Sequence, residues 1–401
     1  MQPLRLALLA PRFWPHWGDA DRHWLALAEG LLAAGHRVTV VCPRWRRAWP
    51  ESMHVGAVPL VRLRGSHRSG WSTLRWMYSL SRWLKEHAAS LDAVLVSGLR
   101  HEAYVAIRAL KGRNLPIALE ALPGDLAWQQ TAAFGSRIAR RCRQAAAVIA
   151  PSRVLAEQLL AAGFAEEQVR VIPWSVQLPP PRSPGQREAA RTALAGVNSD
   201  LVTTDGTPLG LAIGRLDADH RFSDLVRAWR IVTSNRPETR LWIVGDGPER
   251  ERLYRQISDL DLRYRVLIPG TFDCLDELFA AADLFVQPSP CDAPPLALLS
   301  ALASGLPVVA ADSPALRETI VPEQNGLLVP AGDPRALAAR IEGLLASPAE
   351  GVRLGASGRE AMRCLSTSSA MAARYSDVVT KLPSTKYNPP SRPANALNPD
   401  P

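Results

Sequence analysis

The sequence is poor in cysteine, and its cysteines are not arranged for a metal site or a disulfide framework. The 401 residues include 5 cysteines, which lie far apart, and the 8 histidines show no zinc-type spacing. This usage indicates a reducing compartment, so we expect a cytoplasmic protein with buried thiols. Long hydrophobic runs are also missing. Runs such as residues 6–11 and 296–302 fall far below the roughly 18–20 residues that a membrane span needs.

Familiar nucleotide and nucleophile motifs are missing as well. Gly245 and Gly247 follow a predicted strand, but they lack the G-x-G-x-x-G spacing of a dinucleotide site, and no P-loop lysine follows. No Ser-His-Asp or paired-carboxylate arrangement stands out either. The sequence therefore gives no sign of a dinucleotide enzyme or of covalent catalysis.

Positive charge and tryptophan are concentrated in the first half of the chain. Residues 1–180 carry 23 Lys and Arg against 12 Asp and Glu, whereas residues 181–401 carry 24 against 26. Nine of the 12 tryptophans occur by position 128. This pattern predicts a surface that meets an anionic and partly apolar partner. A nucleic acid would satisfy the charge alone, but no other feature supports one, so we expect no nucleic-acid partner.

Strand-like and helix-like segments alternate in two series. Residues 4–9 and 36–42 are strand-like and flank a helical stretch at 21–34 that ends before Gly35. Parallel neighbours need such a crossover, so a parallel sheet is expected. A second alternating series begins at residue 209. The predicted class is α/β, with two Rossmann-like domains that face a central cleft.

The proline-rich stretch after residue 177 separates the two series. The expected segments are an N-terminal domain at 1–178, a linker region at 179–207, a C-terminal domain at 208–375 and a disordered tail at 382–401. In open α/β sheets, ligands bind outside the carboxyl ends of the strands. The loops that follow the predicted strands are therefore the candidate site.

Three of these loops carry polar residues, and each also has a plain structural interpretation. Gly18 and Asp19 precede the first helix, where an ordinary turn with an acidic cap is the alternative. Arg215 ends a strand and suits a diphosphate, although the loop 214–222 also reads as a solvated surface. Asp292 precedes an apolar helix that it would otherwise only cap.

The spacing of several motifs resembles that of the family-four retaining glycosyltransferases, which have the GT-B fold. The matching segments are Ala212–Leu216, Val244–Glu249, Ala281–Ser289, Ala301–Ala310, Asn325–Val329, Gly18, Gly35–Val38, Gly124–Asp125, Val148–Ser152 and Val171–Pro173. The resemblance covers roughly residues 4–375. It implies two Rossmann-like domains around a nucleotide-sugar donor site, with no cofactor and no metal.

The sequence departs from the family where the family does its chemistry. Two glutamates of the family motif are replaced by Asp292 and Ser300, and the lysine that follows the strand-end Arg215 is His220, with Arg221 next. The paired glycines of the amino-terminal loop are Gly18 and Asp19 here. These changes predict a weakened, re-specialised or inactive donor site.

The resemblance implies a retaining hexosyltransferase that uses a nucleoside-diphosphate sugar and a glycan or lipid-linked acceptor. Its catalytic residues would be Arg215, Arg221 and Asp292. Substrate contacts are expected at Gly18, Asp19, His220, Gly245, Ala293, Leu299 and Ser300. The alternative is a catalytically inactive GT-B protein that binds a sugar nucleotide or a partner enzyme.

A peripheral contact with the inner membrane face is also expected. The segment 44–49 reads Arg-Trp-Arg-Arg-Ala-Trp, and Arg75–Trp76 and Arg82–Trp83 recur seven residues apart on the predicted helix 72–87. Tryptophan and arginine suit the headgroup layer. The alternative is that the apolar stripe of this helix packs on the sheet and that its arginines form a solvated face.

Overall fold

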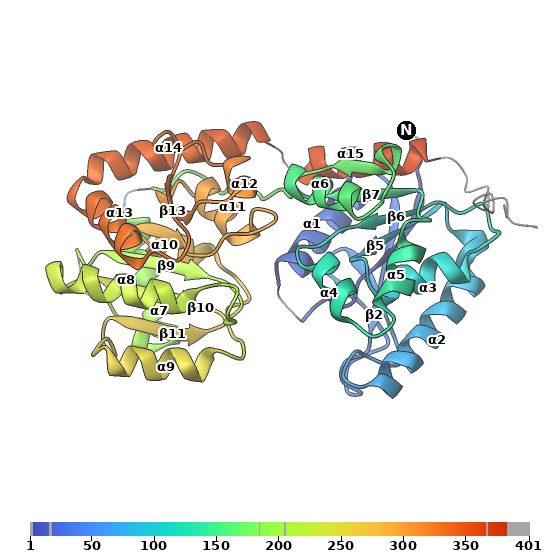
Figure 1. Ribbon diagram of the computed structural model, residues 1–401, viewed down its shortest axis with the longest axis horizontal. Coiled ribbons are helices and arrows are strands. Elements are labelled where there is room, and N and C mark those ends of the chain that lie inside the picture. The colour runs from blue at the N-terminus through green and yellow to red at the C-terminus, as the bar shows by residue number, and fades with distance from the viewer. Residues whose placement is uncertain (1–2, 16–17, 184, 204–205, 366–367, 383–401) are drawn as a thin grey trace, which may run out of the picture.

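The computed structural model describes residues 3–15, 18–183, 185–203, 206–365 and 368–382. Within them the chain forms two α/β domains that lie side by side, each built around its own sheet (Figure 1). Both sheets are parallel except for one edge hairpin, so the predicted fold class is confirmed.

The first sheet has its strands in the order β3-β4-β2-β1-β5-β6-β7-β8, and only β3 runs antiparallel to its neighbour. In spatial order its strands are β3 (Ser52–Val55), β4 (Val58–Leu63), β2 (Arg37–Pro43), β1 (Arg5–Leu9), β5 (Ala93–Ser97), β6 (Ile117–Glu120), β7 (Ala147–Ala150) and β8 (Val169–Val171). The strand order changes direction at β1, which places the loop after β1 at the centre of the carboxyl edge.

Helices cover both faces of this sheet. They are α1 (Asp19–Ala33), α2 (Gly70–His87), α3 (His101–Ala109), α4 (Asp125–Thr131), α5 (Gly135–Cys142), α6 (Arg153–Ala161) and the 3₁₀ helices η1 (Ala88–Ser90) and η2 (Glu166–Gln168). Because side chains alternate along a strand, Leu6 and Leu8 pack beneath α1, whereas Ala7 and Leu9 share a core with α2 and α3.

The second sheet repeats the plan with a wholly parallel order β11-β10-β9-β12-β13-β14. Its strands are β9 (Leu209–Ile213), β10 (Arg240–Val244), β11 (Val266–Gly270), β12 (Leu284–Gln287), β13 (Val308–Ala311) and β14 (Leu327–Val329). Its helices are α8 (Phe222–Asn235), α9 (Arg250–Asp259), α10 (Asp276–Ala281), α11 (Leu296–Ala303), α12 (Pro314–Arg317), α13 (Pro334–Ala346) and α14 (Pro348–Leu365).

The domain boundaries differ from the sequence expectation in two places. The predicted linker holds α7 (Gln186–Val197) and η3 (Ser199–Leu201), and Ala190 and Leu194 of α7 lie in a core of the second domain. The last helix, α15 (Ser368–Lys381), crosses back to the first domain, where Met371 and Tyr375 pack in the core beneath α1. The expected disordered tail lies, beyond residue 382, outside the described residues.

None of the helices in the described part of the chain is long and apolar enough to cross a membrane.

Candidate functional site

The amino end of α1 reaches across to the second domain. Gly18 precedes the helix in extended conformation, and its amide donates to Asp21 Oδ2 at 2.9 Å. Asp19 instead directs its carboxylate outward and accepts from the amide of Leu296, the first residue of α11, at 3.1 Å. A carboxylate of the first domain therefore lies at a helix N-terminus of the second, where an anion is stabilised.

Arg215 and His220 meet on one carboxylate, that of Asp217, in the loop after β9. Arg215 Nε lies 3.3 Å from Asp217 Oδ2, and His220 Nδ1 lies 2.6 Å from Oδ1 of the same side chain. Arg215 remains more than half exposed, at 59% of its side chain, so its guanidinium can still contact a ligand. Arg215 and His220 are thus joined by one carboxylate, whereas the predicted second cation was Arg221.

Charges from both domains surround Asp19. Burial raises the pKa of its carboxyl, while the Leu296 amide, His220 and Arg22 act in the opposite direction. Arg22 lies one helical turn further along α1 and donates to the carbonyls of Phe272 and Asp273, each at 3.1 Å. The two domains therefore meet through charged side chains at the carboxyl edges of their sheets.

Arg221 points elsewhere. Its backbone has φ of +52°, and its Nη1 lies 3.1 Å from Asp224 Oδ2. The same nitrogen lies against Gly332, where an added Cβ would come within 2.8 Å. The contacts of Arg221 thus lie with α8 and with the loop after β14, whereas the loop after β9 turns His220 toward Asp217 and Asp19.

Asp292 is held by the first domain. Its Oδ1 accepts from Gln158 Nε2 on α6 at 3.1 Å, and its carbonyl accepts from Ser152 Oγ at the start of the same helix. The neighbouring Cys291 is largely buried, and burial raises the pKa of its thiol to about 12. Asp292 therefore joins the domains at a second point, close to the α11 terminus.

Four of the predicted substrate-contact residues have side chains that are absent, apolar or partly buried, so a ligand could reach little of them beyond their backbone. Gly245 is packed so tightly that an added Cβ would lie 1.9 Å from the carbonyl oxygen of Gly214, so its glycine is required by the fold. Ala293 and Leu299 are buried, at 2% and 6% exposure, and Leu299 packs in the core of the second domain. Ser300 is half-buried on α11, one turn from the carboxyl end of the helix.

Sequence reasoning missed Arg22, Asp217 and Gln158. Arg22 lies three residues after Asp19 on α1 and so shares a helix face with it, and Asp217 lies two residues after Arg215 in the same loop. Gln158 carries no such signal, because its partner Asp292 is 134 residues away. Arg22 and Gln158 became visible only through the contact between the domains, and Asp217 through its contacts within the loop after β9.

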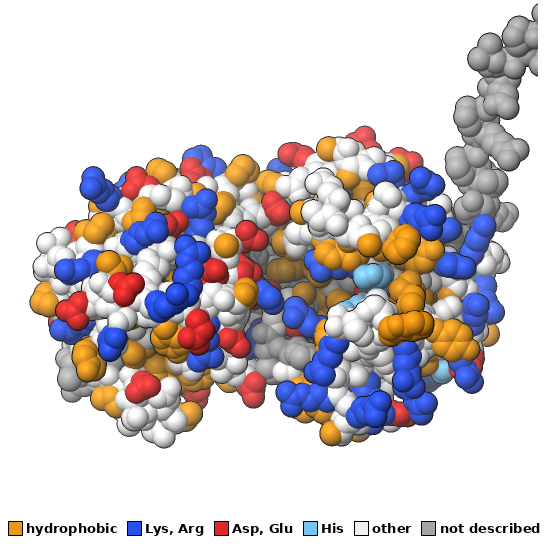
Figure 2. All heavy atoms as spheres, turned by 60° about the horizontal axis from the view of Figure 1, so that its bottom comes forward, with side chains coloured by type: hydrophobic (Ala, Val, Ile, Leu, Met, Phe, Trp, Pro, Cys, Tyr) orange, Lys and Arg blue, Asp and Glu red, His pale blue; other side chains and the backbone are white. Residues whose placement is uncertain are grey.

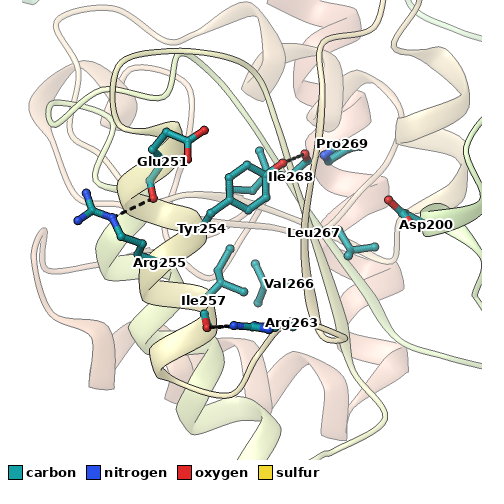
Figure 3. Close-up of a pocket in the computed structure, with 11 residues that line it drawn as sticks. Asp200, Glu251, Tyr254, Arg255, Ile257, Arg263, Val266, Leu267, Ile268 and Pro269 are labelled. Carbon is teal, nitrogen blue, oxygen red and sulfur yellow. Dashed lines mark hydrogen bonds between the residues drawn. The ribbon is translucent and has the colours of Figure 1, made fainter.

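Figure 2 shows a hollow between the two domains, with acidic and basic side chains along its rim. A separate pocket of about 450 Å³ lies on the outer edge of the second domain, between α9 and β11 (Figure 3). Its wall includes Tyr254, whose hydroxyl donates to the carbonyl of Ile268 at 2.9 Å. It contains none of the sequence-predicted site residues, so the candidate site is the edge between the domains.

Two family descriptions match this chain, one on each domain. Residues 20–178 match "Glycosyltransferase Family 4", and residues 199–361 match "Glycosyl transferases group 1". The D-inositol 3-phosphate glycosyltransferase of Xylanimonas cellulosilytica is 30% identical over 321 residues, which cover 77% of this chain and 72% of that protein. The chain belongs to the family-four glycosyltransferases. The sequence-based recognition of this family is confirmed.

Other relatives of this glycosyltransferase match over a shorter length. The lipopolysaccharide core biosynthesis glycosyltransferase LpsD of Rhizobium meliloti is 32% identical over 189 residues, which cover 47% of this chain and 54% of that protein. The LpsE protein of the same organism is 31% identical over 40% of this chain and 46% of its own length. The chain thus spans about half the length of these relatives.

Solved structures share the fold at low identity. HepE of Anabaena, in complex with UDP and glucose, has a TM-score of 0.77 at 18% identity and covers 94% of this chain and 100% of its own. The sucrose-phosphate synthase of Thermosynechococcus elongatus has a TM-score of 0.76 at 22% identity and covers 94% of this chain and 99% of its own. At this identity the likeness establishes the GT-B fold.

Proposed function

We propose that this glycosyltransferase moves a hexose from a nucleoside-diphosphate sugar to a hydroxyl of a glycan or lipid-linked acceptor, with retention of anomeric configuration. The observation that carries the proposal is the position of Arg215. It lies at the carboxyl end of β9, is exposed toward solvent, and shares Asp217 with His220. A planar guanidinium at this edge suits two oxygens of a diphosphate.

In the proposed reaction the bond between the anomeric carbon and the diphosphate oxygen breaks, and the acceptor oxygen attacks the same face. The acceptor proton passes to the leaving diphosphate, so the protein supplies no nucleophile. The leaving group gains negative charge, which Arg215 would stabilise electrostatically. Arg221 was predicted as the second cation, but it pairs with Asp224, whereas His220 shares the carboxylate of Asp217 with Arg215, and we therefore place His220 beside the diphosphate.

The acceptor belongs, in this proposal, to the synthesis of an envelope glycan or exopolysaccharide. Relatives named as lipopolysaccharide core glycosyltransferases and as a glycolipid synthase support this choice. The sequence also predicted a membrane contact through residues 44–49 and the helix that is α2, and on α2 we now propose a different set of residues. Trp76 is fully buried, whereas Trp71, Leu74 and Tyr78 are 86%, 58% and 70% exposed. With the exposed Arg75 they form a stripe on one side of the helix, which suits the headgroup layer of an inner membrane face.

A second candidate is a GT-B protein that binds a sugar nucleotide or a partner enzyme without turnover. The contact of Asp19 with the Leu296 amide favours it, because a carboxylate there competes with an incoming phosphate. The replacement of a family glutamate by Ser300 points the same way.

Calorimetric titration of UDP and GDP, and of their hexose conjugates, separates these functions when a donor-hydrolysis assay accompanies it. We expect binding of one base series, and Arg215→Ala should weaken it roughly 10- to 150-fold, as for the loss of a charged hydrogen bond. Arg227→Ala is the matched control, since that arginine is equally exposed and lies on α8. Unchanged affinity in Arg215→Ala contradicts the assignment, and binding without hydrolysis or transfer favours the inactive form.

A further inference from the structure

Four aromatic rings form a continuous row on the first domain, away from the residues proposed to hold the donor. Trp45 follows β2, His67 follows β4, His101 follows β5, and Trp128 lies on α4 after β6. Successive ring centroids are 6.1, 5.4 and 5.2 Å apart. Four separate segments that follow strands thus bring one ring each to the carboxyl edge of the sheet, where α/β proteins bind ligands. We call these four residues the aromatic row.

The aromatic row is partly exposed, and a buried carboxylate, that of Glu102, bonds one of its rings. All four side chains are half-buried. The buried Glu102 accepts from His67 Nε2 at 2.6 Å and from Trp76 Nε1 at 2.8 Å through a single oxygen, Oε1. Its other oxygen is buried with no hydrogen-bond partner among the described residues, an arrangement that costs free energy. Such a carboxylate is better explained by the orientation it gives His67 than by stability.

Positive charge accompanies the row. The Arg100 guanidinium lies 5.2 Å from the ring centre of Trp128 and donates to the buried Asp125 at 2.7 Å. The same group of loops carries further exposed arginines, at positions 46, 47, 64 and 68. Glu51, a carboxylate in the same group of loops, is already paired with Arg44 at 2.7 Å. The surface around the row therefore attracts anions.

Figure 2 shows histidine side chains among hydrophobic ones on the first domain, with lysine and arginine around them, close to the hollow between the domains. We infer that the aromatic row is a subsite for an anionic sugar of the acceptor, one that carries a phosphate or a carboxylate. The inference rests on the proposed transferase function. The apolar face of a sugar ring packs on an aromatic ring, the imidazoles bond its hydroxyls, and the arginines hold its charge.

Partly exposed aromatic rings and arginines also suit single-stranded nucleic acid. The sugar is favoured because two of the four rings are imidazoles, which bond hydroxyls, and because the row lies at the carboxyl edge of the first sheet, where α/β proteins bind ligands. A nucleic acid is therefore treated as a competing outcome of the test.

The test uses the full chain and defined probes. Glucose 6-phosphate, glucuronic acid and glucose are titrated by saturation-transfer NMR, alongside inorganic phosphate and a ten-nucleotide oligothymidine. We expect glucose 6-phosphate and glucuronic acid to bind at least about fivefold more tightly than glucose, and glucose 6-phosphate more tightly than phosphate. Trp128→Ala should weaken this binding roughly tenfold and Trp128→Phe should restore most of it. Tyr264→Ala, which removes an 80% exposed aromatic from the second domain, is the control.

Equal binding of glucose and glucose 6-phosphate, or an unchanged affinity in a folded Trp128→Ala protein, overturns the inference. The inference is also overturned if oligothymidine displaces the sugars at a mass concentration lower than that of the sugar phosphate. Circular dichroism melting checks that each variant is folded, and Trp45→Ala, which removes another ring of the row, takes the place of Trp128→Ala if that variant does not fold. UDP and GDP are titrated in parallel on the wild-type protein. Sugar-phosphate binding without nucleotide binding would contradict the transferase proposal and support the subsite. Nucleotide binding without sugar-phosphate binding would support the transferase proposal and contradict the subsite.

Discussion

Replacement of Asp19 by asparagine tests whether the donor site is blocked by the protein's own carboxylate. Asp19 Oδ2 accepts from the Leu296 amide at 3.1 Å, at the amino end of α11. A diphosphate that uses this helix terminus has to displace a carboxylate that already occupies it. Asparagine keeps the size and the acceptor oxygen of the side chain but removes its charge.

The size of the effect follows from the two kinds of hydrogen bond. A bond to a charged group contributes about 1.5–3 kcal/mol, and a neutral one about 0.5–1.5 kcal/mol. The difference is about 1–1.5 kcal/mol, so Asp19→Asn should bind the preferred nucleoside diphosphate about five- to tenfold more tightly. The removal of repulsion between the carboxylate and the phosphates acts in the same direction.

The pH dependence gives an independent readout. Burial raises the pKa of Asp19, so as pH falls this carboxyl becomes neutral earlier than an ordinary aspartate. The neutral form competes less with a phosphate, and the affinity of the wild-type protein should rise toward that of Asp19→Asn. The ligand's own phosphate also takes up a proton, near a pKa of about 6, and therefore only the ratio of the two affinities is compared.

Calorimetric titration of the diphosphate from pH 7.5 downward, in about 0.1 M salt, measures this ratio. Asp219→Asn is the matched control, because it removes an exposed carboxylate from the loop after β9. Equal affinity of wild type and Asp19→Asn at all pH values would refute the idea that Asp19 competes with the ligand. An equal gain in Asp219→Asn would assign the effect to net charge alone.

Three further predictions concern the donor motif, the membrane and the core. His220→Lys with Ser300→Glu restores family residues and should raise sugar-nucleotide affinity or turnover about tenfold; if neither quantity changes in titration and hydrolysis assays, the two positions are misaligned. Trp71→Ala with Tyr78→Ala should reduce sedimentation of the protein with anionic vesicles at low salt, and undiminished sedimentation would leave α2 without a membrane role. Glu120→Gln should cost about 3 kcal/mol in urea unfolding, because this buried carboxylate pairs with a histidine at 2.9 Å and accepts from two tryptophans. Burial raises the pKa of Glu120, but the histidine and the two tryptophans lower it by more than burial raises it. The stability lost in Glu120→Gln should therefore shrink as pH falls below the ordinary range of a glutamic acid.

The sequence alone was sufficient for the fold and for the family, because both depend on local patterns. The alternation of strand-like and helix-like segments predicted two parallel sheets, and both are present. The tight turn after β10 required glycine at position 245, since any side chain would strike the carbonyl of Gly214. Arg215 was singled out for its place at a strand end, and it lies there.

Only the tertiary structure decided how the two edges meet. Asp19 and Leu296 are 277 residues apart, and Gln158 and Asp292 are 134 apart, so no local pattern could pair them. The same applies to α2, where packing on the sheet fixes which face of the helix is buried. Trp76 is buried and Trp71 is exposed, although the residue type alone allows either position. The aromatic row depends on four separate segments, and α15 returns to the first domain, because parallel strands gather distant segments at one edge.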